Sequence, residues 1–94
     1  MVYKMTEWQS GSGIWYCNDV SDLGHGKGAW YYAAAALNIS PVNFVKLVIE
    51  KFNPDKVYWN EETGFFSYGW TKQANMRKFK NWFNAESRKC NIQL

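Results

Sequence analysis

Positive side chains gather in the last quarter of the chain, at spacings that bring many of them onto one helix. Glu86 is the only acid between residues 72 and 89. Cations in such a set neutralise backbone phosphates, so we expect contact with nucleic acid, or with a protein complex that handles nucleic acid. The alternative is a solvated helix whose late positive charges complement its own dipole. With one cation from earlier in the chain, the candidate partner-binding residues are Lys46, Lys72, Arg77, Lys78, Lys80, Arg88 and Lys89.

A glycine-rich stretch, Asp19–Gly28, precedes the first expected helix and is the second candidate. Its GHGKG string would offer free backbone N–H groups beside His25 and Lys27, so an anion is the ligand we expect there. The Gly-Lys-Ser/Thr ending of a P-loop is absent. Asp19, Asp22 and His25 match no known metal-ligand spacing, so we expect no metal and no cofactor. An ordinary flexible loop is the alternative.

Residues that could support catalysis are scarce. His25 is the only histidine, and it would form a nucleophile–base pair with Cys17 if Asp22 oriented the imidazole. Nothing in the spacing requires that pairing. Glu61 and Glu62 are neighbours at an expected hairpin tip, whereas hydrolysis needs opposed carboxyl groups in a cleft. We therefore expect no catalytic residue and a non-enzymatic binding module, with a small enzyme centred on Cys17 and His25 as the remote alternative.

Aromatic side chains make up 19% of the chain, and six of them are tryptophans. A core of this size cannot enclose all six, and each buried indole N–H needs a hydrogen-bond partner. Exposed Trp and Tyr side chains are common hot spots of protein interfaces. They predict the alternative function, a protein-binding inhibitor or adaptor such as one that acts against host defence. An aromatic core wrapped around a thin sheet is the structural alternative.

Two hairpins are expected where β-forming residues flank turn residues. The first joins Val2–Trp8 to Ile14–Cys17 across the glycine- and serine-rich turn that lies between them. The second joins Lys56–Asn60 to Phe65–Trp70 across Glu-Glu-Thr-Gly. An edge strand with exposed aromatic side chains would also allow a homodimer. Alternation along the last strand places three aromatic residues on one face: Phe66, Tyr68 and Trp70.

Three helices are expected, over Ala29–Leu37, Pro41–Phe52 and Lys72–Lys89. Ser40 is a favourable N-cap, and proline follows it at the first helical position. Asn53, which precedes a proline, ends that helix. The last helix carries an apolar stripe at helical spacing: Met76, Phe79, Trp82 and Phe83.

These elements predict one small α+β domain over residues 1–94, with a short tail at 91–94. The expected order is β-β-α-α-β-β-α, with antiparallel hairpins packed against helices. A four-stranded sheet with helices on one face would cover the apolar faces. The sequence does not decide whether the two hairpins share one sheet.

The segment Ala33–Val48, AAAALNISPVNFVKLV, resembles a helix-turn-helix, and the hairpin after it resembles the wing of winged-helix proteins. The resemblance implies that its second helix reads DNA. Val42, Val45 and Ile49 lie on the outward face of that helix, which favours instead a core helix buried on two sides. The apolar and turn positions of the family are matched in order by Ala33, Ala34, Leu37, Asn38, Ile39, Phe44 and Leu47.

In size, in Lys and Asn content and in aromatic content, the chain is similar to small phage and prophage proteins of low-GC Gram-positive bacteria. Its net charge of +3 favours an anionic partner. No apolar run approaches the ~20 residues of a membrane helix, and Met1–Ser10 lacks the apolar run of a signal peptide. We therefore expect a cytoplasmic protein without a membrane partner, in which Cys17 and Cys90 are free thiols.

Overall fold

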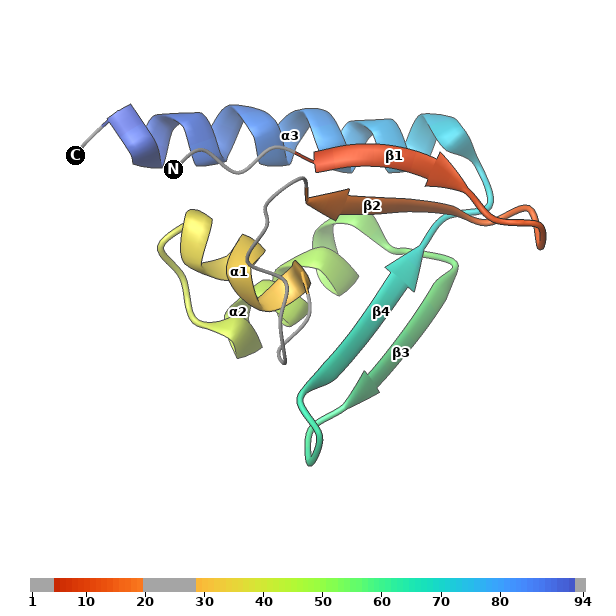
Figure 1. The fold of residues 1–94 in the computed structure, drawn as a ribbon, viewed down its shortest axis with the longest axis horizontal. Coiled ribbons are helices and arrows are strands. Elements are labelled where there is room, and N and C mark those ends of the chain that lie inside the picture. Colours follow the sequence, from red (N-terminus) through yellow and green to blue (C-terminus); the bar gives the residue numbers. More distant parts are fainter. Residues whose placement is uncertain (1–4, 20–28, 93–94) are drawn as a thin grey trace.

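The structure is a computed structural model that describes residues 5–19 and 29–92. Within them the chain forms the expected α+β arrangement of two antiparallel hairpins and three α-helices (Figure 1). Asp22, His25 and Lys27 lie outside the described residues, as do the first residues of the first expected strand. The elements are β1 (Met5–Gln9), β2 (Trp15–Asp19), α1 (Ala29–Ala36), α2 (Pro41–Leu47), the π-helical turn η1 (Val48–Phe52), β3 (Lys56–Asn60), β4 (Phe65–Gly69) and α3 (Gln73–Ile92).

Most helix ends follow the local signals in the sequence. Ser40 caps α2, because its Oγ accepts a hydrogen bond from the backbone N–H of Asn43 at 3.2 Å. Asn38 and Asn53 take left-handed φ values of 59° and 45° after the first two helical segments. The last helix ends at Ile92 and not at Lys89, because the residues that follow Lys89 include neither Gly nor Pro to stop it.

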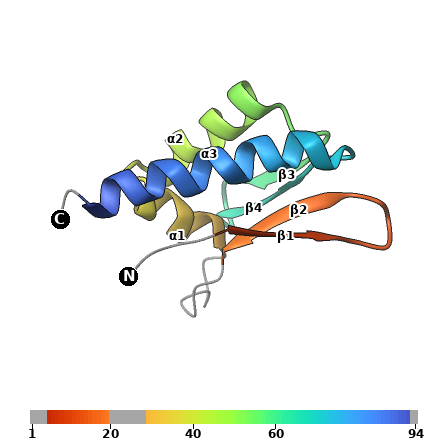
Figure 2. The same ribbon diagram turned by 90° about the horizontal axis from the view of Figure 1, so that it is seen from above.

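The long helix α3 lies over the rest of the molecule, and β1 runs beside it (Figure 1). Seen from above, α2 lies to one side of α3 and the β1–β2 hairpin to the other (Figure 2). The backbone N–H of Met5 donates to Asn84 Oδ1 at 2.9 Å, which ties the start of β1 to the helix. The β3–β4 hairpin projects away from this body as an arm (Figure 1).

The two hairpins form separate two-stranded sheets that meet at one point. There, the backbones of Trp15 and Trp70 exchange hydrogen bonds, 2.7 Å from Trp15 N to Trp70 O and 2.8 Å from Trp70 N to Trp15 O. Beyond this bridge β2 and β4 diverge (Figure 1). A single four-stranded sheet, one way of covering the apolar faces, is therefore not what the chain forms.

The core is mainly aromatic and centres on Phe79 of α3, which is fully buried. Its ring stacks on Trp70 at 5.4 Å between centroids and meets the rings of Phe44 and Tyr68 at 6.3 and 5.7 Å. The expected face of β4 is confirmed, since Phe66, Tyr68 and Trp70 are all buried. The helical stripe is also confirmed for Met76, Phe79 and Phe83, whereas Trp82 remains partly exposed.

The expected helix Pro41–Phe52 widens into a π-helical turn over Val48–Phe52. The Phe52 ring packs on Phe79 and on Trp82, with both pairs of centroids 5.2 Å apart. Its carbonyl accepts the indole N–H of Trp70 at 2.9 Å. A carbonyl at a helix end needs such a partner, so tertiary contacts account for a turn that the sequence did not indicate.

The outward face of the second helix is buried only in part. Val45 is 4% exposed, whereas Val42 and Ile49 are 49% and 38% exposed. Burial on two sides, expected from the apolar outward residues, is therefore wrong for Val42 and Ile49. The reason is that the β3–β4 hairpin stands off as an arm, and only Trp59 of that arm lines the groove beside them.

Among the described residues, no helix combines the length and the apolar character that crossing a membrane requires.

Gly69 allows β4 to approach β2 closely, which makes it the sharpest test of how the hairpins are joined. A Cβ added there would lie 2.7 Å from Ile14 Cγ2, 2.8 Å from the Trp15 carbonyl oxygen and 2.8 Å from Tyr16 Cδ1. We predict that Gly69→Ala lowers the free energy of unfolding by about 1–3 kcal/mol, measured by urea denaturation. Gly11→Ala is the matched control, because no atom lies within 4 Å of its added Cβ. Equal stability of the two variants would contradict this account.

Candidate functional site

Helix α3 presents different residues on each of its faces. Met76, Phe79, Phe83 and Ser87 recur at helical spacing and are buried at 0–1% exposure. A second row faces β1, and a third faces solvent. Lys72 precedes the first residue of the helix, and the other five predicted cations are divided between these last two rows, so their roles differ: Arg77, Lys78, Lys80, Arg88 and Lys89.

The row that faces β1 holds Glu7 in a network of charged hydrogen bonds. Arg77 Nη2 lies 3.1 Å from Glu7 Oε1, and Lys80 Nζ lies 2.9 Å from Glu7 Oε2. The side-chain amide of Gln73 donates to Glu7 Oε1 at 3.0 Å. Hydrogen bonds from Arg77, and then from Lys80, lower the pKa of Glu7 from 4.5 to about 2. Arg77 and Lys80 therefore clamp β1 to the helix, and their charge is partly neutralised.

The remaining predicted cations are exposed to solvent: Lys78 and Arg88 lie on α3, and Lys72 lies immediately before it. None of them forms an ion pair within residues 5–19 and 29–92. Lys89 pairs with Glu86 at 3.3 Å, but its side chain is 69% exposed and such a pair contributes little. These residues leave a row of available positive charge along the outer face of the helix.

One cation that the sequence analysis missed lies beside this face. Lys51 Nζ of η1 sits 5.1 Å from the Trp82 ring centroid and 5.8 Å from that of Phe52. No local pattern links residue 51 to residue 82, because the π-helical turn brings them together. The Trp82 ring thus contacts the rings of Phe52 and Phe79 as well as the Lys51 ammonium group.

Lys46 lies apart from the α3 row. It is exposed on α2 and lines a groove of about 230 Å³ with Val42, Val45, Ile49 and Trp59 among its neighbours. No described residue of α3 lines that groove. The structure therefore does not bring Lys46 together with the cations of the last helix.

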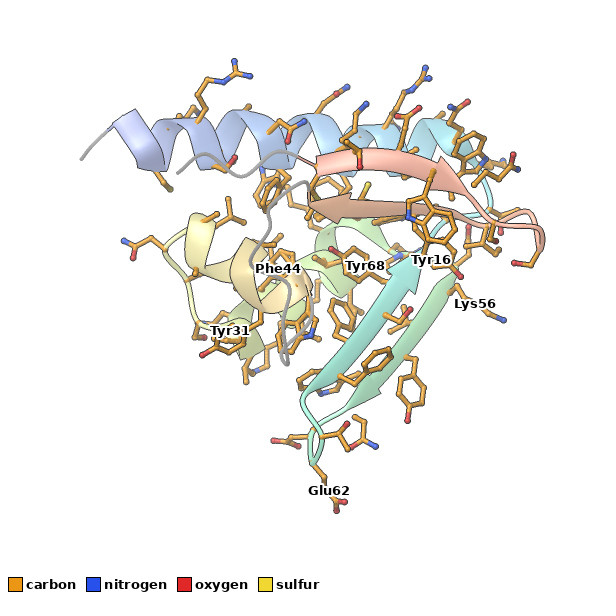
Figure 3. All side chains as sticks on the ribbon, in the orientation of Figure 1. Tyr16, Tyr31, Phe44, Lys56, Glu62 and Tyr68 are labelled. Atoms are coloured by element: carbon orange, nitrogen blue, oxygen red, sulfur yellow. The ribbon has the colours of Figure 1, made fainter. Side chains whose placement is uncertain are left out.

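Acidic residues of the β3–β4 hairpin lie away from α3. Glu61 and Glu62 are exposed at the hairpin tip, and Figure 3 shows Glu62 at the end of the arm farthest from the helix. Glu7 and Glu86 are the acids paired with α3 cations among the described ion pairs. Asp55 lies closer to the helix, since its Oδ2 accepts a hydrogen bond from the Thr71 backbone N–H at 2.8 Å. The acids that are separated from α3 are thus the two at the tip of the arm.

A second feature is an aromatic groove between the β1–β2 hairpin and β4, with a volume of about 450 Å³. Trp8 stacks on Tyr16 at 4.9 Å between centroids and is 44% exposed, and Phe65 is 54% exposed. The prediction that not every tryptophan is buried is confirmed by Trp8. Six rings line the groove: Trp8, Tyr16, Trp30, Phe65, Phe66 and Tyr68.

Cys17, the described half of the nucleophile–base pair in the remote alternative, is poorly suited to nucleophilic attack. Cys17 is buried, with Sγ 3.8 Å from the Met76 carbonyl oxygen, and burial raises the pKa of its thiol from 9.0 to about 12. Cys17 and Cys90 are both free, as expected. In the part of the chain that the structure describes, no group of His, Cys, Asp and Glu side chains could hold a metal ion.

Comparisons with protein-family models, with curated proteins and with solved structures return no match for this chain.

The Glu7 clamp should make stability depend on acid pH. A carboxylate whose folded pKa is depressed stabilises the fold above its unfolded pKa and loses that contribution as pH falls toward the folded value. We predict that Glu7→Gln lowers the free energy of unfolding near neutral pH by about 1 kcal/mol, and that this difference shrinks toward about pH 2.5. Urea denaturation across this pH range measures it. Glu62→Gln is the control, and a pH-independent Glu7→Gln effect would contradict the clamp.

The two thiols should differ in reactivity. Because the raised pKa keeps Cys17 protonated, we predict that iodoacetamide at about pH 8 modifies the partly exposed Cys90 first. Cys17 should react only after denaturation, as read by mass spectrometry of the peptides. Comparable native-state labelling of both thiols would show that Cys17 is accessible and would revive the nucleophile hypothesis.

Proposed function

We propose that the protein is a non-enzymatic binding module that holds nucleic acid against the solvent face of α3. The observation that carries the proposal is the row of exposed cations without described acidic partners, Lys78 and Arg88 on a helix of 20 residues and Lys72 just before its first turn. The backbone that carries these cations is already ordered in the helix before binding. Each phosphate that they neutralise releases a counterion, which favours association. Lys89, beside Arg88, adds to the row.

The placement of acids supports the same face. Glu61 and Glu62 lie at the far tip of the arm, so they do not oppose a polyanion that approaches α3. Arg77 is 54% exposed even in its ion pair and can meet a phosphate at the edge of the row. The helix-turn-helix-like segment offers less, because α2 exposes Val42, the following η1 exposes Ile49, and Lys46 is the cation of α2. The proposal therefore assigns binding to α3.

A protein-binding role is the second candidate, and the exposed apolar face of α2 and η1 favours it. Val42 and Ile49 border a groove with Trp59, and such a surface is suited to burial by a partner. The two candidates differ in salt dependence. Binding to α3 should weaken steeply with salt, whereas burial of an apolar face should not.

Charge reversal on α3 tests the proposal against the effect of net charge alone. We predict that Lys78→Glu and Arg88→Glu each weaken binding of a fluorescein-labelled single-stranded oligonucleotide, measured by anisotropy at low salt. Each should also reduce the slope of log K against log[salt] by about 1. Lys46→Glu changes the net charge equally but lies on α2, so it should have a smaller effect.

Two results would overturn the α3 proposal. One is the absence of binding by the unmodified protein at low salt. The other is equal weakening by Lys46→Glu and Lys78→Glu, which would mean that overall charge, and not the helix face, accounts for the association.

A further inference from the structure

The aromatic groove exposes rings that its own hairpins do not cover. Register pairs Trp8 with Tyr16 across β1 and β2, and their rings stack with an interplanar angle of 26°. Tyr16 therefore covers one side of the Trp8 indole and orients it, while Trp8 remains 44% exposed. On the opposite wall, Phe65 of β4 is 54% exposed. Rigid rings held in this way are prepared to accept a further ring by stacking.

Trp30 forms a fixed aromatic wall of the groove. It lines the groove and is 6% exposed. Edge-on contacts with Trp59 and Phe66, at 5.3 and 5.9 Å between centroids, fix the indole. Its Nε1–H is itself buried, so Trp30 contributes the ring and not a hydrogen bond to a ligand in the groove.

The chemistry of the groove excludes a charged ligand group. Its described lining contains no Lys, Arg, His, Asp or Glu side chain, and besides the rings it consists of Ser10, Ser12, Ser67 and Cys17. A phosphate or a carboxylate would be desolvated there without a counter-charge. A neutral, planar ring meets these requirements, and the volume of about 450 Å³ falls within the roughly 300–1,000 Å³ of ligand pockets.

The β1–β2 hairpin separates this neutral groove from the cationic helix. Glu7 and Trp8 are consecutive in β1, so their side chains project from opposite faces of the hairpin. Glu7 contacts Arg77 and Lys80 of α3, and Trp8 lines the groove. A flexible chain that crosses the edge of β1 would meet cations on one side and stacking rings on the other.

We propose that the groove binds one unstacked nucleobase of a single-stranded nucleic acid whose phosphates contact α3. The base stacks on Trp8 or Phe65. This inference rests on the proposed function and adds to it a preference for single strands over duplexes, because a paired base cannot enter the groove. Ring stacking is tolerant of base identity, so the preference does not depend on sequence.

The test compares an oligodeoxythymidine with an abasic oligonucleotide of the same length, which keeps the phosphates and lacks the bases. We expect the abasic strand to bind the unmodified protein about tenfold more weakly. Trp8→Ala and Phe65→Ala should each remove most of that difference and leave abasic binding unchanged. Val42→Ala, which shortens an exposed apolar side chain outside the groove, is the matched control and should preserve the difference.

The outcomes separate the two proposals. If neither strand binds, the proposed function fails, and the inference fails with it. If both strands bind equally while Lys78→Glu still weakens them, the α3 face stands and the nucleobase site is overturned. That second result would instead favour a side chain of a protein partner as the occupant of the groove.

Because Trp8→Ala removes the stack on Tyr16, the folding of each variant is checked by thermal unfolding followed by circular dichroism. If Trp8→Ala does not fold, the result for Phe65→Ala decides whether the groove binds a base.

Discussion

Trp70 connects the three parts of this molecule, and the rest of the structure depends on its position. Its backbone exchanges hydrogen bonds with Trp15, which joins the two hairpins. Its ring stacks on Phe79 of α3, and its indole N–H bonds to the carbonyl of Phe52 at the end of η1. The residue is fully buried and its indole N–H is hydrogen-bonded. One side chain therefore supplies both a large buried apolar area and a directional hydrogen bond to this small core. The width of the aromatic groove follows from this joint, because β2 and β4 diverge from it.

The sequence predicted the elements well and their assembly poorly. Ser40, Asn53 and the Glu-Glu-Thr-Gly loop act on neighbouring residues, so helix starts, helix ends and the β3–β4 hairpin could be inferred. Two separate sheets and the π-helical turn could not, because they result from contacts between residues far apart in the chain. Phe52 meets Trp70 across 18 residues, and no periodicity within one segment reports such a contact.

The candidate site divides in the same way. Spacing alone indicated that Lys78 and Arg88 share a helix, since a 3.6-residue period is a local property, although the helix starts at Gln73 and leaves Lys72 just outside it. It could not indicate that Arg77 and Lys80 bind the carboxylate of Glu7, which lies 70 residues before Arg77 in the chain. These two cations are therefore less available to a ligand. The aromatic groove was also hidden, because Trp8 and Phe65 become neighbours only through the Trp15–Trp70 bridge. The high aromatic content was the one signal in the sequence for this groove. It predicted that some aromatic side chains are exposed, but not where they lie on the molecule.

Division of the cations between two rows allows stability and binding to be separated. Arg77 and Lys80 stabilise β1 against α3, so a phosphate that drew them away would have to compete with a carboxylate at 2.9–3.1 Å. Lys78 and Arg88 face solvent and have no such competitor among the described ion pairs. A ligand can therefore use the outer row without loosening the hairpin. Because β1 carries both Glu7 and Trp8, the clamp that secures the strand also holds one wall of the groove in place before any ligand arrives.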